Sequence, residues 1–168
     1  IMKINIGSSE IVHFIGIGGI GMSGLAQIMN NMGFFVQGSD LNKNKNTERL
    51  TKLGVKFFFG HNKKNLKKAT LVVISSAVKK NNSELKFARF KKLPIFKRGD
   101  MLANIVALKK NIVVTGSHGK TTTTSLVANI LVEAGLDPTV INGGVINSLK
   151  NNAQLGKGEW AVIESDES

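Results

Sequence analysis

The residues of this chain with the clearest chemical character form a glycine-rich stretch followed by a lysine and four threonines, Gly116 to Thr124 (GSHGKTTTT). Such a stretch is typical of a phosphate-binding loop: backbone amides cradle phosphates, the lysine bridges the terminal ones and a threonine hydroxyl binds Mg²⁺. The standard P-loop pattern requires glycine at position 114, where this chain has Val114, so the loop is a shorter variant. Consecutive threonines begin a helix poorly by propensity, which favours a need for hydroxyls beside phosphate.

A second glycine loop lies near the start of the chain, where Gly16 to Gly21 (GIGGIG) satisfies the G-x-G-x-x-G pattern. Its glycines let backbone amides approach a pyrophosphate, and the helix that follows adds partial positive charge. Asp40 ends the next expected strand, where a carboxylate can accept hydrogen bonds from a ribose. These features fit an NAD-dependent oxidoreductase, another diphosphate-containing nucleotide, or a tight turn without a ligand, and the motif alone does not choose.

An acidic side chain ends a late apolar segment, where Glu164 follows the expected strand 160–163. Neighbouring strands of a parallel sheet have their carboxyl ends at one edge, which is where ligands bind. Glu164 is therefore a candidate second Mg²⁺ ligand beside the phosphate loop. Asp166 and Glu167 compete for this role on charge alone, and all three also fit ordinary surface acids.

The elements that position these residues alternate between strand-length apolar segments and longer amphipathic ones. Gly33 and Gly54 are suited to ending helices, and Ser83 is a plausible N-cap. The alternation predicts an α/β fold with a Rossmann-like parallel sheet covered by helices on both faces. In the first part of the chain we expect strands at 11–16, 34–38, 55–59, 71–75 and 94–96, and helices at about 20–32, 47–53, 83–91 and 99–108.

A second unit begins near residue 110 with a new strand, loop and helix. We expect a strand at 111–115, a helix at 121–134 and further strands at 138–141 and 160–163. This predicts one domain over residues 1–109 and the beginning of a P-loop ATPase α/β domain over residues 110–168. Ile1 precedes Met2, and Ser168 follows an acidic run directly after a strand, so the chain is interpreted as a fragment.

Composition narrows the function classes. Cysteine is absent, which excludes a disulfide framework, a thiolate metal site and a cysteine nucleophile. The net charge of +12 comes mostly from scattered lysines, so it favours phosphorylated ligands over nucleic acid. No apolar run approaches the roughly 20 residues of a membrane span, and the start does not resemble a signal peptide. These features predict a cytoplasmic protein with neither a membrane nor a nucleic-acid partner.

Taken together, the motifs resemble those of the Mur ligase family. The matching segments keep the family's order and spacing: His13–Ala26 (HFIGIGGIGMSGLA), Gly38–Asp40 (GSD), Gly60–His61, Ser75–Ala77 (SSA), Gly116–Thr124 and Glu164–Ser168 (ESDES). The short phosphate loop is also the form that this family uses. The resemblance implies three domains: a Rossmann-like module for a UDP-sugar, a central ATPase and a module for the amino acid. By this resemblance, the chain would contain the first domain and the beginning of the second.

The resemblance also implies which residues bind ligands. The UDP-sugar would lie among Gly16, Gly18, Gly19, Gly21, Met22, Ser39, Asp40, His61, Ser76 and Ala77. ATP would be held by Gly116, Ser117, His118, Gly119, Lys120, Thr121 and Thr122. Lys120 would contact the ATP phosphates, and Thr121 and Glu164 would coordinate Mg²⁺, which makes these three the expected catalytic residues.

The implied activity is ATP-dependent joining of L-alanine to the lactyl carboxylate of UDP-N-acetylmuramate through an acyl phosphate, in peptidoglycan precursor synthesis. The fragment alone is expected to be inactive, because the rest of its own chain completes the enzyme. Three alternatives stay open at this point. One is an NAD-dependent Rossmann oxidoreductase, one is a related ligase that attaches a recycled muropeptide to the same nucleotide sugar, and one is a non-catalytic nucleotide-binding regulator.

Overall fold

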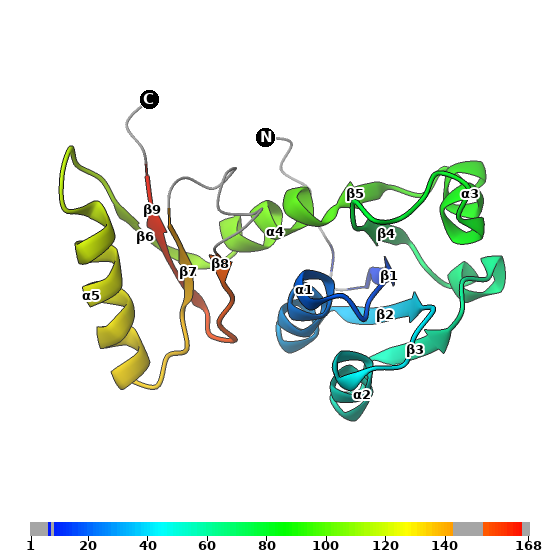
Figure 1. Cartoon of the computed structure of the whole chain (residues 1–168), viewed down its shortest axis with the longest axis horizontal. Coiled ribbons are helices and arrows are strands. Elements are labelled where there is room, and N and C mark those ends of the chain that lie inside the picture. The colour runs from blue at the N-terminus through cyan, green and yellow to red at the C-terminus, as the bar shows by residue number, and fades with distance from the viewer. Residues whose placement is uncertain (1–6, 8, 143–152, 166–168) are drawn as a thin grey trace. The chain divides into compact units, whose positions relative to one another are not determined.

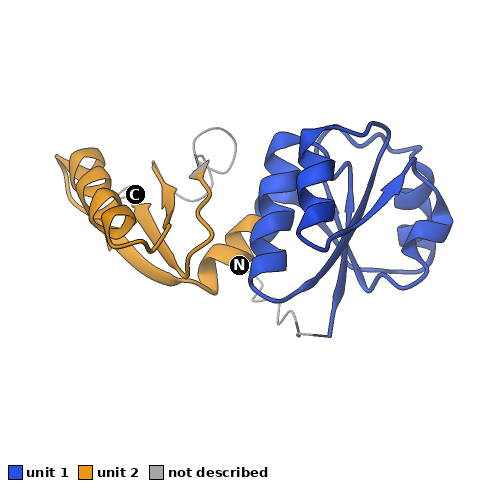
Figure 2. Ribbon diagram, turned by 90° about the horizontal axis from the view of Figure 1, so that it is seen from below, with its two compact units in different colours: residues 1–101 blue, residues 102–168 orange. Residues whose placement is uncertain are grey.

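The computed structural model describes residues 7, 9–142 and 153–165, and its course is drawn in Figure 1. The chain divides into two compact units, residues 1–101 and 102–168 (Figure 2). This division falls within helix α4 (Arg98–Ala107), ahead of the boundary between residues 109 and 110 that the sequence predicts. The boundary at 109/110 stays a proposal for where one domain ends and the next begins.

The first unit is built on a five-stranded parallel sheet with strand order β3-β2-β1-β4-β5. This is the sheet that the βα alternation predicts. Its strands are β1 (Ile11–Ile15), β2 (Phe35–Asp40), β3 (Lys56–Phe59), β4 (Leu71–Ile74) and β5 (Ile95–Lys97). Between them lie α1 (Ile20–Asn31), α2 (Lys45–Lys52), the short 3-10 helix η1 (Lys63–Leu66) and α3 (Ser83–Phe90).

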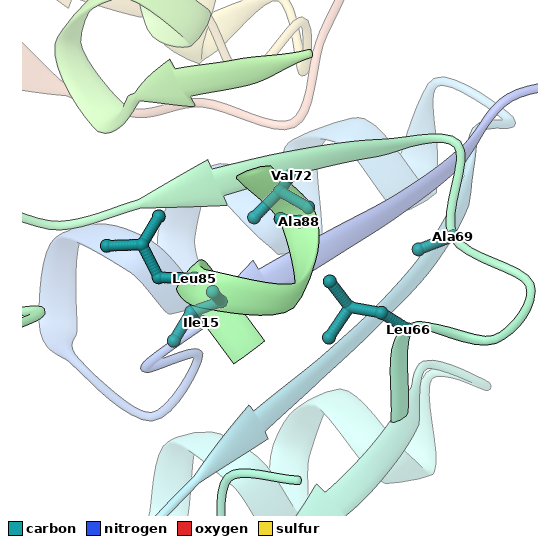
Figure 3. Close-up of a cluster of buried hydrophobic side chains, with 6 residues drawn as sticks. All are labelled: Ile15, Leu66, Ala69, Val72, Leu85 and Ala88. Atoms are coloured by element: carbon teal, nitrogen blue, oxygen red, sulfur yellow. The ribbon is translucent and has the colours of Figure 1, made fainter. Parts of the chain in front are cut away.

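Helices lie on both faces of this sheet. The chain moves from β1 to β3 in one direction and then from β4 to β5 in the other, so right-handed crossovers place α1 and α2 opposite α3. On the α3 side, a cluster of buried side chains fills the space between helix and sheet (Figure 3). It consists of Ile15, Leu66, Ala69, Val72, Leu85 and Ala88.

Local signals explain where the helices begin and end, with one correction. Gly33 and Gly54 have φ of 91° and 88°, which confirms them as residues suited to following a helix. The prediction of Ser83 as N-cap of α3 is wrong. Asn82 is the cap, because its side-chain oxygen accepts from the backbone amides of Glu84 and Leu85, at 2.9 and 3.1 Å. Ser83 Oγ instead donates to the carbonyl of His61 at 2.9 Å.

The second unit contains a four-stranded sheet in the order β6-β9-β7-β8. Its elements are β6 (Lys110–Val114), α5 (Lys120–Glu133), β7 (Thr139–Ile141), β8 (Ala153–Gln154) and β9 (Trp160–Glu164). Strand β9 is parallel to both β6 and β7, whereas the two-residue β8 is antiparallel to β7. The sequence did not predict β8, because two residues carry no periodicity. Placing β9 beside β6 brings the end of the described chain next to the phosphate loop.

Candidate functional site

The phosphate loop joins the end of β6 to the start of α5. Gly116 and Gly119 have φ of 145° and 75°, in the region that residues with side chains rarely adopt, so both positions favour glycine. Gly119 is the N-cap of α5, and its carbonyl accepts the amide of Thr123 at 3.0 Å. Ser117 and His118 are exposed and contact each other at 3.3 Å. The loop therefore presents backbone and polar groups ahead of a 14-residue helix, the geometry that favours an anion.

Thr121 and Glu164 meet across this loop. Thr121 Oγ1 lies 3.2 Å from each carboxylate oxygen of Glu164. Glu164 is the last residue of β9, is only 7% exposed and pairs in register with Val114, the residue before the loop. Lys120 begins α5 and is half-buried, and Thr122 lies exposed on the same first turn. The competing acids Asp166 and Glu167 lie outside the described residues.

Sequence reasoning missed a third oxygen at this edge of the sheet. Asn142 follows β7, and because Ile141 pairs with Ile163, Asn142 and Glu164 are the next residues on adjacent parallel strands. The side-chain oxygen of Asn142 and the hydroxyl of Thr124 are buried without a hydrogen-bond partner. A buried polar atom left unpaired is costly, so it points to a missing ligand or water. The signal in the sequence was a carboxamide immediately after a buried strand.

These residues fit a Mg²⁺ site that is completed by phosphate and water. Mg²⁺ prefers oxygen ligands and usually takes only one or two carboxylates from a protein. Thr121, Glu164 and Asn142 supply hydroxyl, carboxylate and carboxamide oxygens, and the Asn142 oxygen has no partner of its own. Within residues 7, 9–142 and 153–165, no group of three or more histidine, cysteine or acidic side chains forms a cage that would hold a metal without such help.

The first glycine loop is held in place by hydrogen bonds to the end of β2, at Ser39 and Asp40. The amides of Gly16 and Ile17 donate to the Ser39 carbonyl at 2.8 and 3.0 Å, and the Gly18 amide donates to Asp40 Oδ2 at 2.8 Å. A Cβ on Gly18 would lie 2.9 Å from both Asp40 Oδ2 and Asn44 Nδ2. Asp40 thus shapes the loop through its hydrogen bond to Gly18, and the close approach of Asp40 and Asn44 requires glycine at position 18.

The rest of this loop opens α1. Gly19 is the N-cap and has no side chain to cap the helix, so the first amides of α1 remain available to a ligand. Gly21 lies close to the guanidinium of Arg98. A Cβ added to Gly21 would be 3.0 Å from Arg98 Nη1. Met22 belongs to the first turn of α1, and it is only 2% exposed. Met22 therefore packs in the core rather than lying open to solvent.

The remaining predicted sugar-nucleotide residues follow the carboxyl ends of neighbouring strands. Ser39 is buried in β2, and its hydroxyl lies 2.9 Å from Nδ1 of His61. His61 follows Gly60, whose φ is 80° and whose amide donates to the Asp40 carbonyl at 2.7 Å. Ser76 and Ala77 are exposed in the turn after β4. Because β3, β2, β1 and β4 are consecutive strands of one parallel sheet, the structure gathers these residues at one edge of that sheet.

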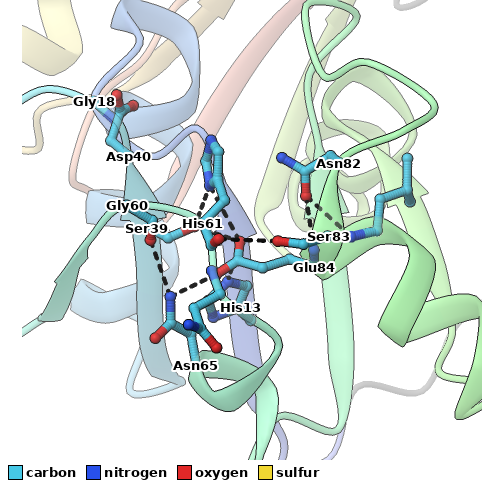
Figure 4. A network of polar contacts seen from close by, with 12 residues as sticks. His13, Gly18, Ser39, Asp40, Gly60, His61, Asn65, Asn82, Ser83 and Glu84 are labelled. Atoms are coloured by element: carbon cyan, nitrogen blue, oxygen red, sulfur yellow. Dashed lines mark hydrogen bonds and ion pairs between the residues drawn. The ribbon is translucent and has the colours of Figure 1, made fainter.

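A buried polar network lies beneath that edge, and sequence reasoning did not find it (Figure 4). Its centre is the carboxylate of Glu84, in the first turn of α3, which is 0% exposed. His13, Gln37 and Ser39 lie on the sheet face that α3 covers. Ile15 belongs to the cluster under α3, and His13, two residues before it on the same strand, faces the same side. Ser39 pairs with Ile15 and Gln37 pairs with His13 on the neighbouring strand, so they share this face. Seeing this cluster requires the register between strands, which the sequence does not state.

The charge of Glu84 is stabilised where it lies. Burial by itself raises the pKa of a carboxyl group, but hydrogen bonds from His13, Ser39 and Asn65 and the electrostatic attraction of the His13 ring outweigh it. The pKa of Glu84 is consequently lower than its ordinary value of 4.5, so the carboxylate is ionised at neutral pH.

The fold and the two loops define an α/β protein with two successive strand, glycine-loop and helix modules, the construction used by nucleotide-binding proteins. Comparison with known families gives the particular group. The sequence matches the description "Mur ligase family, catalytic domain" over residues 11–110 and "Mur ligase middle domain" over residues 114–164. The chain belongs to the Mur ligase family.

Individual relatives agree with this assignment. The UDP-N-acetylmuramate–L-alanine ligase of Pelagibacter ubique is 65% identical over 167 residues, covering 99% of this chain and 36% of that protein. A solved structure of UDP-N-acetylmuramate–alanine ligase from Thermotoga maritima has a TM-score of 0.61 at 37% identity, covering 91% of this chain and 36% of that one. A Neisseria meningitides UDP-N-acetylmuramate:L-alanyl-gamma-D-glutamyl-meso-diaminopimelate ligase has a TM-score of 0.65 at 31% identity, covering 94% and 53%.

The chain spans about a third of the length of the curated relatives it matches. Among its described helices, none combines the length and apolarity that a bilayer crossing requires.

Proposed function

We propose that this chain is the nucleotide-binding part of an ATP-dependent ligase that joins L-alanine to the lactyl carboxylate of UDP-N-acetylmuramate. The observation that carries the proposal is the contact between Thr121 and Glu164 beside a glycine loop, in a chain 65% identical to a ligase of that name. These two side chains offer oxygen atoms that would bind Mg²⁺ at the N-terminal end of α5. The proposed substrates are nucleotides and an amino acid, so we propose the cytoplasm as the compartment.

The proposed ATP site consists of Gly116, Ser117, His118, Gly119, Lys120, Thr121 and Thr122. Backbone amides and the Lys120 ammonium would hold the phosphates, because both carry positive charge toward them. Thr121 and Glu164 would hold Mg²⁺, and the unpaired Asn142 oxygen is a third donor at the same edge. When bound, Mg²⁺ supplies positive charge that offsets the negative charge of the phosphates.

The proposed UDP-sugar site is the edge of the first sheet, at Gly16, Gly18, Gly19, Gly21, Met22, Ser39, Asp40, His61, Ser76 and Ala77. The uncapped start of α1 suits a diphosphate, while Asp40 and His61 offer polar groups for the nucleoside. In this assignment Met22 supports the loop through the core, and Ser39 acts through His61, because both side chains are buried.

The proposed reaction needs activation because a carboxylate is a poor electrophile. The lactyl carboxylate oxygen attacks the γ-phosphorus of ATP, and ADP leaves. The amine of alanine then attacks the acyl phosphate, the amide forms, and inorganic phosphate leaves with the loss of an amine proton. Lys120 would stabilise the charge on the transferred group, which is the main protein contribution to phosphoryl transfer. The module for alanine would come from the part of the parent protein beyond this chain.

The alternative functions receive less support. The relatives at 54–65% identity are named as alanine ligases, whereas the muropeptide ligase from Neisseria is 31% identical. An NAD-dependent oxidoreductase would leave the phosphate loop of the second unit unexplained. A non-catalytic regulator is less favoured because the relatives at 54–65% identity are named as ligases.

The proposal is tested with Lys120→Ala in the full-length parent enzyme. We expect loss of amide formation, measured as phosphate release that depends on alanine, with UDP-N-acetylmuramate binding unchanged by calorimetry. Lys157→Ala, an exposed lysine of the same unit, is the matched control. Substantial activity in the Lys120 variant would refute the assigned role. On the chain itself, calorimetric titration with UDP and with NADH separates the ligase from the oxidoreductase.

A further inference from the structure

In the polar network beneath the first glycine loop, the donor and the acceptor of each hydrogen bond can be assigned in turn, starting from Gln37. The side-chain nitrogen of Gln37 donates to the carbonyl of Asn65 at 2.8 Å and lies 3.0 Å from Nδ1 of His13. A carboxamide nitrogen has two hydrogens and only donates, so Nδ1 of His13 accepts. The proton of the neutral His13 ring is therefore on Nε2.

The carboxylate of Glu84 receives every hydrogen bond that reaches it. Its Oε2 lies 3.3 Å from Nε2 of His13, and its Oε1 accepts from Asn65 Nδ2 at 2.7 Å and from the Asn62 amide at 3.2 Å. An ionised carboxylate has lone pairs and no hydrogen, so it can only accept. The lowered pKa of Glu84 agrees with this direction.

Ser39 passes this direction on to His61. The hydroxyl of Ser39 has one hydrogen, and it donates that hydrogen to Oε2 of Glu84 at 2.5 Å. Toward Nδ1 of His61, which is 2.9 Å away, Ser39 Oγ can offer only a lone pair. Nδ1 of His61 must therefore carry a hydrogen, and this nitrogen also lies 3.3 Å from Oε2 of Glu84. Figure 4 shows the three side chains lying together.

We propose that Glu84 is a positioning residue that fixes the hydrogen of the neutral His61 ring on Nδ1, so that Nε2 of this neutral ring presents a lone pair to a ligand. The two histidines beside Glu84 are thus held in different tautomers by one carboxylate. His13 has its hydrogen on Nε2, and His61 has its hydrogen on Nδ1. The His61 side chain is 17% exposed, and its contacts with Ser39 Oγ and Glu84 Oε2 are both made through Nδ1.

This arrangement selects the chemistry of the ligand group that His61 meets, a step that rests on the proposed UDP-sugar site. A neutral ring with a lone pair on Nε2 accepts a hydrogen bond, and it does not provide the positive charge that would attract a phosphate. His61 should therefore contact a neutral donor of the nucleoside, either the imide N–H of the uracil or a ribose hydroxyl. The diphosphate is left to the amides at the start of α1.

The form of the His61 ring is measured directly by ¹⁵N NMR on the chain without ligand. The chain has three histidines, and His61→Gln identifies the His61 signals, while the exposed His118 is an internal reference. We expect the Nδ1–H form for His61 and the Nε2–H form for His13 at neutral pH. An Nε2–H or a doubly protonated His61 ring would overturn the proposal, and this outcome requires no variant to fold.

Two variants separate positioning by Glu84 from a merely structural role. In Ser39→Ala, Nδ1 of His61 still lies near Oε2 of Glu84, so the Nδ1–H form should persist. In Glu84→Gln, the side chain can present its amide hydrogens to Ser39, so the preference for Nδ1–H should be lost while the His118 signals stay unchanged. A His61 ring that keeps its form in Glu84→Gln, with His13 still in a folded environment, would refute the role of Glu84.

The ligand step is tested with UDP, 3-methyl-UDP, 2′-deoxy-UDP and 3′-deoxy-UDP against the chain and against His61→Phe. If His61 accepts from one donor, the analogue lacking that donor should bind about tenfold weaker to the unmodified chain but nearly as well as UDP to His61→Phe. Equal losses in both proteins for every analogue would refute the proposed contact. If UDP fails to bind the unmodified chain, the UDP-sugar site fails, while the ring form remains tested by NMR.

Discussion

The hydroxyl of Thr121, in the first turn of α5, lies 3.2 Å from both carboxylate oxygens of Glu164 at the end of β9, although 43 residues separate them. The contact exists because β9 is inserted beside β6, which places the end of β9 at the loop that follows β6. A hydroxyl has one hydrogen and the carboxylate has several lone pairs, so most of the oxygen lone pairs in this pair stay free for a cation.

Glu164→Gln tests this pair as a metal site. Removing the carboxylate takes the anionic ligand from a hard cation, so we expect Mg²⁺-dependent ATP binding to fall by at least about tenfold. Calorimetry in Mg²⁺ and in EDTA measures the effect. The control is Glu159→Gln, which removes the same charge from an exposed residue paired with Lys110 at 3.1 Å. ATP binding that is as strong in Glu164→Gln as in the unmodified chain would contradict the assignment.

Gly18→Ala tests whether the first loop depends on close approach. The added methyl would lie 2.9 Å from Asp40 and Asn44, so these side chains must shift, and we expect UDP affinity to fall by about tenfold or more with a destabilisation of about 1–3 kcal/mol. In Gly33→Ala the methyl enters open space at φ of 91°, so only backbone strain of about 1–2 kcal/mol applies. UDP affinity should therefore fall in Gly18→Ala and stay unchanged in the control Gly33→Ala. Equal UDP affinities in the two variants would contradict the prediction.

The pH dependence of stability reports on Glu84. Its pKa is lower in the folded chain than the ordinary value of 4.5, so ionised Glu84 contributes stability above that pH. The contribution is lost as the pH falls through the lower, folded pKa. Urea unfolding between about pH 6 and pH 3 should therefore show a shallower loss of stability in Glu84→Gln than in the unmodified chain. The exposed Glu133→Gln is the control, and equal slopes in all three proteins would contradict the prediction.

Two positions on α5 distinguish the buried side of the helix from the exposed side. Ala128 is 7% exposed, and a lysine there would bury a charge, so Ala128→Lys should destabilise the second unit by several kcal/mol. Ile130 is 68% exposed, and Ile130→Lys should change the unfolding free energy by no more than about 0.5 kcal/mol. Thermal unfolding followed by circular dichroism measures both. Similar melting temperatures for the two variants would show that α5 packs differently.

Much of this structure was predictable because local signals decide it. Apolar runs of strand length marked β1, β4 and β6, and positive-φ glycines marked the ends of helices. The meeting of Thr121 and Glu164 followed from a general rule about parallel strands. The network of Glu84 did not follow, because it joins β1, β2, η1 and α3 through side chains whose facing depends on register. The cap at Asn82 was missed because two adjacent residues, Asn82 and Ser83, both suit that position.

The strand order of the second unit also governs when it can fold. Strand β6 pairs with β9, so Lys110 can pair only after Trp160 has been synthesised. In the first unit, β1 pairs with β2, which follows after a single helix. Contacts between distant segments form late, since the intervening chain must first be closed into a loop. During synthesis on the ribosome, the first unit can therefore acquire its shape while the second is still incomplete. The contact between Thr121 and Glu164 can form only after the segment ending at Glu164 has left the exit tunnel.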